Sequence, residues 1–421
     1  MVRLSNRWKV LTACYALFSM VVVAIVCLAV IFDVASPFFT GRSYSGDLLD
    51  IPYYADKPWA RQFLEDQEAI ASAMVRYEPF TVWRHPPYQS STVNVDASRR
   101  RVVPATSQAP DALQVFFFGG STMWGTSSPD WATLPNQVVE LFQGRSTRPL
   151  HAVNFGESAW VSTQSLIALQ QALQRGERPE VVVFYEGAND LLMGFVNNSP
   201  FEHGEYVRVA SVFNSNGRGR GSRMVWFPRP GSLARGLMPN TFFRLDRSQQ
   251  YARAPVGGSE EQLQQLAEQV AQVYRTNQET VRALGRRYQF ETRFYWQPHS
   301  AYGKKPFNEA EEAIIAQRTP NPQWLRSFRR FASLVHAAVT EMPSEDFRDL
   351  SNVFAEQTQQ IYTDPSHVTP EGNRLIAEAM VEDLARNCAA FQISPGEVKV
   401  PNAETSPLGG DEAADAEAKP E

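Results

Sequence analysis

Apolar and polar residues alternate in different ways along the chain, and the pattern separates an apolar amino terminus, a central region and a polar tail. Short apolar runs in the central region predict strands at 113–118, 150–154, 181–185 and 290–296. Apolar residues that recur every three to four positions predict helices near 134–143, 163–175, 260–288, 309–342 and 370–388. The fourth of these helices should break near Pro320 and Pro322. Strands and helices in this order predict an α/β fold, in which helices cover both faces of a parallel sheet.

The first apolar segment, residues 10–32, carries no charged side chain. It is long enough to cross a hydrocarbon core of about 30 Å as a helix. A cleavable signal peptide has a shorter apolar core and a small-residue cleavage site, and Pro37 makes the sequence after this segment a poor one. We therefore expect a retained transmembrane anchor. Basic residues precede it and Asp33 follows it, which predicts a cytoplasmic amino terminus (1–9) and a periplasmic or extracellular remainder.

Three further regions flank or interrupt the expected main domain, which covers 111–393. Residues 33–110 predict a helix within 56–76 and short strands at 81–83 and 92–95. We expect this region to be a stem that packs on the main domain, and contact with substrate is the alternative. Residues 394–421 lack large apolar residues almost entirely and are expected to be a disordered acidic tail.

Residues 191–258 interrupt the alternation of strands and helices over a length that is unusual for a structureless connection. This insertion begins directly after Asn189, so its root should lie near the carboxyl edge of the sheet. A lid or acceptor-binding flap and a tolerated surface insertion are both open. Its basic stretch, 214–223, suits an anionic polymer or lipid headgroups, and a solvated loop is the alternative.

Composition excludes several classes of function. The chain has a net charge of −5, and we find no basic stripe of the kind that binds nucleic acid. Cys14 and Cys27 lie in the apolar segment, and Cys388 is the one cysteine left outside it, so no disulfide is expected there. Neither Cys-x-x-Cys nor His-Glu-x-x-His occurs in the sequence. We therefore expect no metal site and no cofactor.

Candidate chemistry begins where the first predicted strand of the sheet ends. The segment Val115-Phe-Phe-Phe-Gly-Gly-Ser-Thr-Met-Trp-Gly125 places Ser121 after two glycines, at the carboxyl end where α/β sheets bind ligands. A serine needs a base, and Asp364-Pro-Ser-His367 offers an imidazole with a carboxylate to orient it. An ordinary turn or a helix N-cap is the other interpretation of Ser121. A phosphate loop is excluded, because Thr126 stands where that loop needs lysine.

Two more motifs follow predicted strands, Asn154-Phe-Gly156 and Glu186-Gly-Ala-Asn189-Asp190. With the serine and histidine segments they form four blocks, in order, from about 113 to about 386. In this arrangement the chain resembles the SGNH hydrolases, the superfamily that includes the GDSL esterases and lipases. The resemblance implies a three-layer α/β/α fold of flavodoxin-like type. One departure is Gly120, which stands where the GDSL subgroup carries aspartate. That aspartate is not a triad member, so the departure concerns the subgroup and not the chemistry.

The resemblance also implies roles for individual residues. Ser121 would be the nucleophile, with His367 as base and Asp364 as its orienting acid. Ser121, Gly156 and Asn189 would supply the oxyanion-hole donors. Independently of the resemblance, Gln297 and His299 follow a predicted strand that ends on the same side of the sheet, so either could line the pocket, but a core edge or a loop is the favoured interpretation.

These inferences predict a membrane-anchored serine esterase that acts on O-acyl esters. An acylated carbohydrate, with O-acetyl groups on cell-envelope or exported polysaccharide, is the first choice of substrate, which implies a polysaccharide export or acetylation complex as a partner. The alternatives are an O-acetyltransferase, a lipase or thioesterase, and a catalytically silent glycan-binding or assembly protein.

Overall fold

A five-stranded sheet forms the centre of the structure, a computed structural model that describes residues 6–40, 51–72, 75–143, 148–215, 236–341 and 344–391. Its strands run in the order β4-β3-β5-β6-β7, and every neighbouring pair is parallel. Their bounds are β3 (Leu113–Gly119), β4 (Leu150–Asn154), β5 (Val181–Glu186), β6 (Glu291–Trp296) and β7 (Phe347–Asp349). In chain order this is the 2-1-3-4-5 arrangement of flavodoxin-like folds. The predicted parallel sheet is confirmed.

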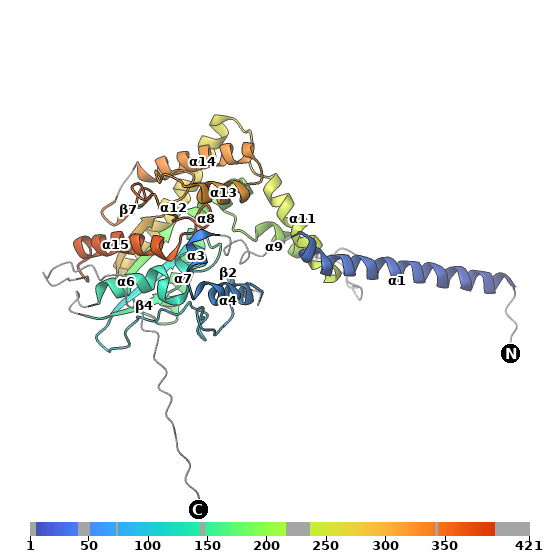
Figure 1. Ribbon diagram of the computed structural model, residues 1–421, viewed down its shortest axis with the longest axis horizontal. Coiled ribbons are helices and arrows are strands. Elements are labelled where there is room, and N and C mark those ends of the chain that lie inside the picture. Colours follow the sequence, from blue (N-terminus) through green and yellow to red (C-terminus); the bar gives the residue numbers. More distant parts are fainter. Residues whose placement is uncertain are drawn as a thin grey trace, which may run out of the picture.

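Helices cover both faces of this sheet (Figure 1). One face packs on α6 (Leu134–Phe142) and α15 (Pro370–Asn387). The other packs on α7 (Ser162–Gln174), α8 (Ala188–Asn197), α12 (Glu260–Tyr288) and α14 (Pro322–Thr340). Alternate residues of β3 serve the two layers: Val115 and Phe117 belong to the core under α6 and α15, and Phe116 and Phe118 to the core under α7. The three-layer α/β/α architecture is therefore confirmed.

Most predicted elements of the main domain are present, with ends displaced by only a few residues. The break near Pro320 separates α13 (Glu309–Gln317) from α14. Strand β7 was not predicted, because three half-buried residues at a sheet edge are too few to show a period. The predicted strand at 92–95 is wrong: this segment forms only isolated bridges, in which Val95 faces Tyr88 and Arg101.

The amino-terminal helix α1 (Asn6–Thr40) projects from the domain (Figure 1). Among the described residues it is the one helix long and apolar enough to cross a membrane, over Trp8–Ala35, although a signal sequence would meet the same criterion. Its carboxyl end lies against α11 (Pro239–Ala252). There the Asp33 carboxylate accepts hydrogen bonds from the backbone N–H groups of Asn240 at 3.1 Å and Thr241 at 2.5 Å.

The region from 191 to 258 is largely helical in its described part. It contains most of α8, then α9 (Tyr206–Ser215) and α11, which pack on each other. The failure of the strand–helix alternation here was therefore misleading. Helix α9 does carry apolar residues at helical spacing, at 206, 209 and 213, but the segment is short and was not recognised as a helix from the sequence. Residues 216–235, with most of the basic stretch, and the tail from 392 onward lie outside the described residues.

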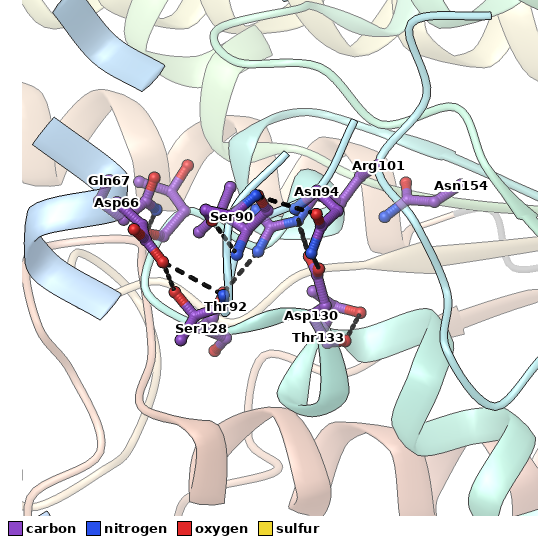
Figure 2. Close-up of polar contacts among 12 residues, drawn as sticks. Asp66, Gln67, Ser90, Thr92, Asn94, Arg101, Ser128, Asp130, Thr133 and Asn154 are labelled. Atoms are coloured by element: carbon purple, nitrogen blue, oxygen red, sulfur yellow. Dashed lines mark hydrogen bonds and ion pairs between the residues drawn. The ribbon is translucent and has the colours of Figure 1, made fainter. Parts of the chain in front are cut away.

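The predicted stem contributes α3 (Pro52–Ala55), α4 (Ala60–Ser72), β1 (Arg76–Glu78) and β2 (Val82–Arg84). Figure 2 shows the polar network through which the following residues contact the main domain. Arg101, which is 1% exposed, pairs with Asp130 at 2.5 Å and donates to the Ser128 carbonyl at 3.0 Å. Its guanidinium also lies 4.4 Å from the Trp124 ring centre. Since Asn94 donates to Asp130 at 2.7 Å as well, this region is joined to the loop that follows the predicted serine nucleophile.

Candidate active site

Ser121 opens the short helix α5 (Ser121–Trp124) directly after β3, at the carboxyl edge of the sheet. The two preceding glycines are required by close contacts. A Cβ on Gly119 would lie 2.4 Å from the Tyr185 carbonyl oxygen, and one on Gly120 would lie 2.2 Å from Nδ2 of Asn189. Asn189 follows β5, the strand next to β3 on the side where the strand order reverses. The serine and the asparagine thus meet at the position where folds of this type bind ligands.

The structure brings together three predicted residues from distant parts of the chain. His367 Nε2 lies 2.7 Å from Ser121 Oγ, and His367 Nδ1 lies 2.5 Å from Asp364 Oδ2. Asp364 Oδ1 also accepts the backbone N–H groups of Ser366 and His367, both at 2.8 Å. Because the carboxylate accepts a proton-bearing Nδ1, the lone pair of Nε2 faces the serine hydroxyl. The geometry suits transfer of the hydroxyl proton from serine to histidine.

Electrostatics keep Asp364 ionised. Burial alone would raise the pKa of its carboxyl, but the charge of His367 and the hydrogen bonds from His367 and Ser366 outweigh this effect. The pKa of Asp364 is therefore held well below its usual range. A carboxylate that stays charged can hold the imidazole in one tautomer and stabilise it when it becomes protonated.

The loop that carries Asp364 and His367 is braced by a side chain that sequence reasoning missed. Glu311, which is fully buried, accepts the backbone N–H groups of Ile361 at 3.0 Å and Tyr362 at 2.9 Å. Its other oxygen pairs with Lys305 at 2.6 Å. The available signal was the capping box at the start of α13, in which Asn308 and Glu311 bond each other's backbone. A capping box predicts where a helix starts, but it does not predict that Glu311 also binds the loop that carries Asp364 and His367.

Donors for a developing oxyanion come from helix starts and side chains near Ser121. The N–H of Ser121, in the first turn of α5, has no intrahelical acceptor. Asn189 Nδ2 uses one hydrogen to bond the Trp160 carbonyl at 2.9 Å, which leaves the second for a ligand. Gly156 is arranged differently from what the resemblance implies: its N–H donates to Asn154 Oδ1 at 2.8 Å, and the residue does not line the cleft.

Ala159 is a candidate for such a donor. It lines the same cleft as Ser121 and Asn189, and its backbone has a left-handed conformation with φ of 59°. Within the described part of the chain, no acceptor is found for its N–H. The sequence carried no signal for it, because glycine and asparagine are the residues usually seen in this conformation.

A cleft of about 980 Å³ extends from Ser121 along α8, α11 and α14. The exposed surface of its walls is mostly apolar, and the large apolar and aromatic side chains are Trp83, Leu192, Met193, Val196, Phe243, Tyr251, Trp324, Leu325 and Phe328. Gln297 and His299 are buried outside it, with Gln297 Oε1 at 3.5 Å from Thr122 Oγ1. Burial lowers the pKa of His299 to about 4, so this imidazole is neutral near neutral pH.

No protein-family model matches the sequence, and no curated protein matches it. Among solved structures, the lipase Lip_vut3 from a goat rumen metagenome matches with a TM-score of 0.38 and 10% identity, over 65% of this chain and 97% of that one. An acetyl xylan esterase, AlAXEase, matches with a TM-score of 0.32 and 14% identity, over 64% and 98%. A putative lipolytic protein of the G-D-S-L family from Desulfitobacterium hafniense gives 0.30 and 10%, over 64% and 98%.

Similarity at this level of identity and TM-score does not carry an assignment, so the chain's own geometry has to. That geometry comprises the strand order, the serine and asparagine at the reversal point, and the histidine and aspartate just before α15. Together these form a flavodoxin-like parallel sheet with a serine, a histidine and an aspartate aligned at its carboxyl edge.

Proposed function

We propose that this chain is a serine esterase. The observation that carries the proposal is the continuous hydrogen-bonded array from Ser121 through His367 to Asp364, which opens into a cleft large enough for an organic ester. A serine hydroxyl with an aligned base and a buried orienting carboxylate is the arrangement that acyl transfer needs. A silent binding protein would have no requirement for this alignment.

The mechanism follows from the positions of the donors and acceptors. His367 Nε2 takes the hydroxyl proton as Ser121 Oγ attacks the ester carbonyl. The carbonyl oxygen becomes negative, and the N–H groups of Ser121 and Ala159 with the side-chain amide of Asn189 stabilise it. His367 then passes its proton to the leaving alcohol, and an acyl-enzyme on Ser121 remains. Water, activated by the same imidazole, releases the acid.

The first substrate class is an O-acyl ester, with O-acetyl groups on cell-envelope or exported polysaccharide as the first candidate. Beside its apolar residues, the cleft is lined by Glu205, Arg208 and Arg247, whose polar atoms can hydrogen-bond sugar hydroxyl groups. Transfer of the acyl group to a sugar hydroxyl instead of water is the O-acetyltransferase variant of the same chemistry. In this proposal the amino terminus is cytoplasmic, α1 crosses the membrane, and the catalytic domain works outside, beside a polysaccharide export or acetylation complex.

A second candidate is an ester of a longer acyl chain, and the wall of the cleft favours it. Leu192, Met193, Phe243 and Leu325 line a cleft of about 980 Å³, which is far more space than an acetyl group on Ser121 needs.

The test is turnover of p-nitrophenyl acetate by the full chain in detergent, beside Ser121→Ala and His367→Ala. We expect both variants to lose at least about 10³-fold in kcat while they remain folded. Thermal unfolding controls for structure. Equal turnover in the folded variants and the parent would rule out Ser121 as the nucleophile toward this ester. A series of p-nitrophenyl esters of increasing chain length then separates an acetylesterase from an enzyme of longer acyl groups.

A further inference from the structure

One wall of the catalytic cleft is attached to the proposed membrane anchor. Phe243 and Tyr251 of α11 line the cleft. The amino terminus of the same helix is held by Asp33, near the end of α1, through the N–H groups of Asn240 and Thr241. Figure 1 shows α1 leaving the domain beside α9 and α11. If α1 crosses a bilayer, these two helices lie at its surface.

Helix α9 exposes an apolar stripe at this junction. Tyr206, Val209 and Phe213 are 40%, 44% and 68% exposed. Their spacing of three and four residues puts them on one face of the helix. An exposed apolar stripe is costly in water and is typical of helices that lie in a membrane interface.

Helix α11 adds a second exposed apolar flank. Leu245 is 46% exposed and does not line the cleft, although its neighbour Phe243, two positions earlier, does. Two residues turn a helix by about 200°, so Leu245 points away from the cleft. The basic side chain of Arg247 lies at the cleft, where headgroup phosphates would attract it. Arg208 lies there too and pairs with Glu205 at 3.3 Å.

We propose that α9 and α11 rest on the phospholipid bilayer that α1 spans, with Phe213 and Leu245 in the interface. The apolar cleft then opens beside the bilayer and takes its ester from an amphiphile held there. The contact rests on the membrane-spanning role of α1, and the substrate class rests on the proposed esterase function. The continuity from anchor to α11 to cleft wall selects a bilayer over a second copy of the chain or a protein partner.

The contact is tested without reference to activity. The full chain carrying Cys14→Ala and Cys27→Ala receives one new cysteine, by Phe213→Cys or by Tyr288→Cys, and a bimane label. Tyr288 is the matched control, because it is an exposed aromatic residue at the far end of α12, whose 29 residues span about 43 Å. In vesicles of phosphatidylcholine and phosphatidylglycerol, brominated lipid should quench the label at 213 at least about twofold more than at 288.

The route of the substrate is tested by turnover in the same vesicles. The double variant Phe213→Glu/Leu245→Glu and the control Tyr288→Glu are compared on water-soluble p-nitrophenyl acetate and on 4-methylumbelliferyl oleate dissolved in the bilayer. We expect the double variant to lose about tenfold on the oleate, because charged side chains are disfavoured in the interface, and to keep its rate on the acetate. The control should keep both rates.

The quenching experiment decides the membrane contact, and the turnover experiment decides the source of the substrate. Equal quenching at 213 and 288 overturns the membrane contact, whether the chain is active or not, and leaves a second copy or a protein partner to cover the stripe. Quenching at 213 with an unchanged ratio of the two rates, or with acetate turnover alone, overturns the membrane-held substrate while the contact stands. If neither ester is hydrolysed, the esterase function and its substrate class fail together, and the quenching still decides the contact.

Discussion

Replacement of Asn189 by alanine separates transition-state stabilisation from the rest of the proposed mechanism. Its side-chain amide has two hydrogens, one of which bonds the Trp160 carbonyl at 2.9 Å while the other is free for the substrate oxygen. Asn189 also lies in the first turn of α8, where the helix dipole strengthens its attraction for a negative oxygen. The variant removes this donor and leaves the Ser121–His367 hydrogen bond untouched.

The variant should change both the reaction barrier and the stability, because the Asn189 amide serves the substrate oxygen with one hydrogen and the Trp160 carbonyl with the other. Loss of one oxyanion donor raises the barrier by about 2.7 to 4 kcal/mol, or about 10²- to 10³-fold in kcat. KM should change little, because the ground-state carbonyl is neutral. The Trp160 carbonyl loses its partner, which costs about 1 to 3 kcal/mol of stability. That is less than the whole stability of an ordinary domain, about 5 to 15 kcal/mol, so the variant should fold.

The assay is steady-state turnover of p-nitrophenyl acetate, with thermal unfolding and labelling of Ser121 by a fluorophosphonate as controls. We expect labelling to persist at a reduced rate while kcat falls. A folded Asn189→Ala protein whose kcat drops less than about fivefold would contradict the placement of Asn189 in the oxyanion hole. The same loss seen mainly in KM would show a role in substrate binding instead.

Three further changes test neighbouring parts of the site. Gly156→Ala should destabilise the protein, because the new Cβ would lie 2.5 Å from the backbone nitrogen of Trp124; a lower melting temperature, with kcat kept in the folded fraction, is expected if its N–H serves Asn154 and not the substrate. Asp364→Asn should lower kcat about 10⁴-fold through the wrong imidazole tautomer. The depressed pKa of Asp364 contributes stability above the unfolded carboxyl value of about 3.9 and loses it below, so the gap in melting temperature between parent and Asp364→Asn should shrink from pH 7 to pH 3. Glu311→Ala should cost about 3 to 5 kcal/mol in urea unfolding, because it leaves Lys305 buried without its partner; a cost below about 1 kcal/mol would show that the pair does not brace the loop.

The layered fold was predictable from sequence because buried positions require apolar residues, and the spacing of these residues differs between strands and helices. A central parallel strand such as β5 is apolar at almost every position, and a long helix such as α12 repeats its apolar residues every three to four positions. The order of these elements then leaves few topologies. Strand β7 lies at the edge of the sheet and is three residues long, so its sequence shows no apolar pattern that predicts a strand. Its pairing with β6 depends on tertiary contacts.

Prediction of the candidate site from sequence was limited to residues whose side chains take part in the chemistry. The grouping of Ser121, His367 and Asp364 could be predicted from sequence, because the proposed chemistry restricts the type of side chain at each of the three positions. A backbone donor leaves no such mark, since every residue except proline has an N–H, and its role depends on where the turn points it. The lack of a side chain at Gly156 serves its close approach to Trp124, and its N–H bonds Asn154. The donor that we propose instead lies three residues later, at Ala159, which lines the cleft. Sequence motifs can therefore predict which loop supplies an oxyanion-hole donor. Which N–H group of that loop points at the substrate can be seen only in the folded structure.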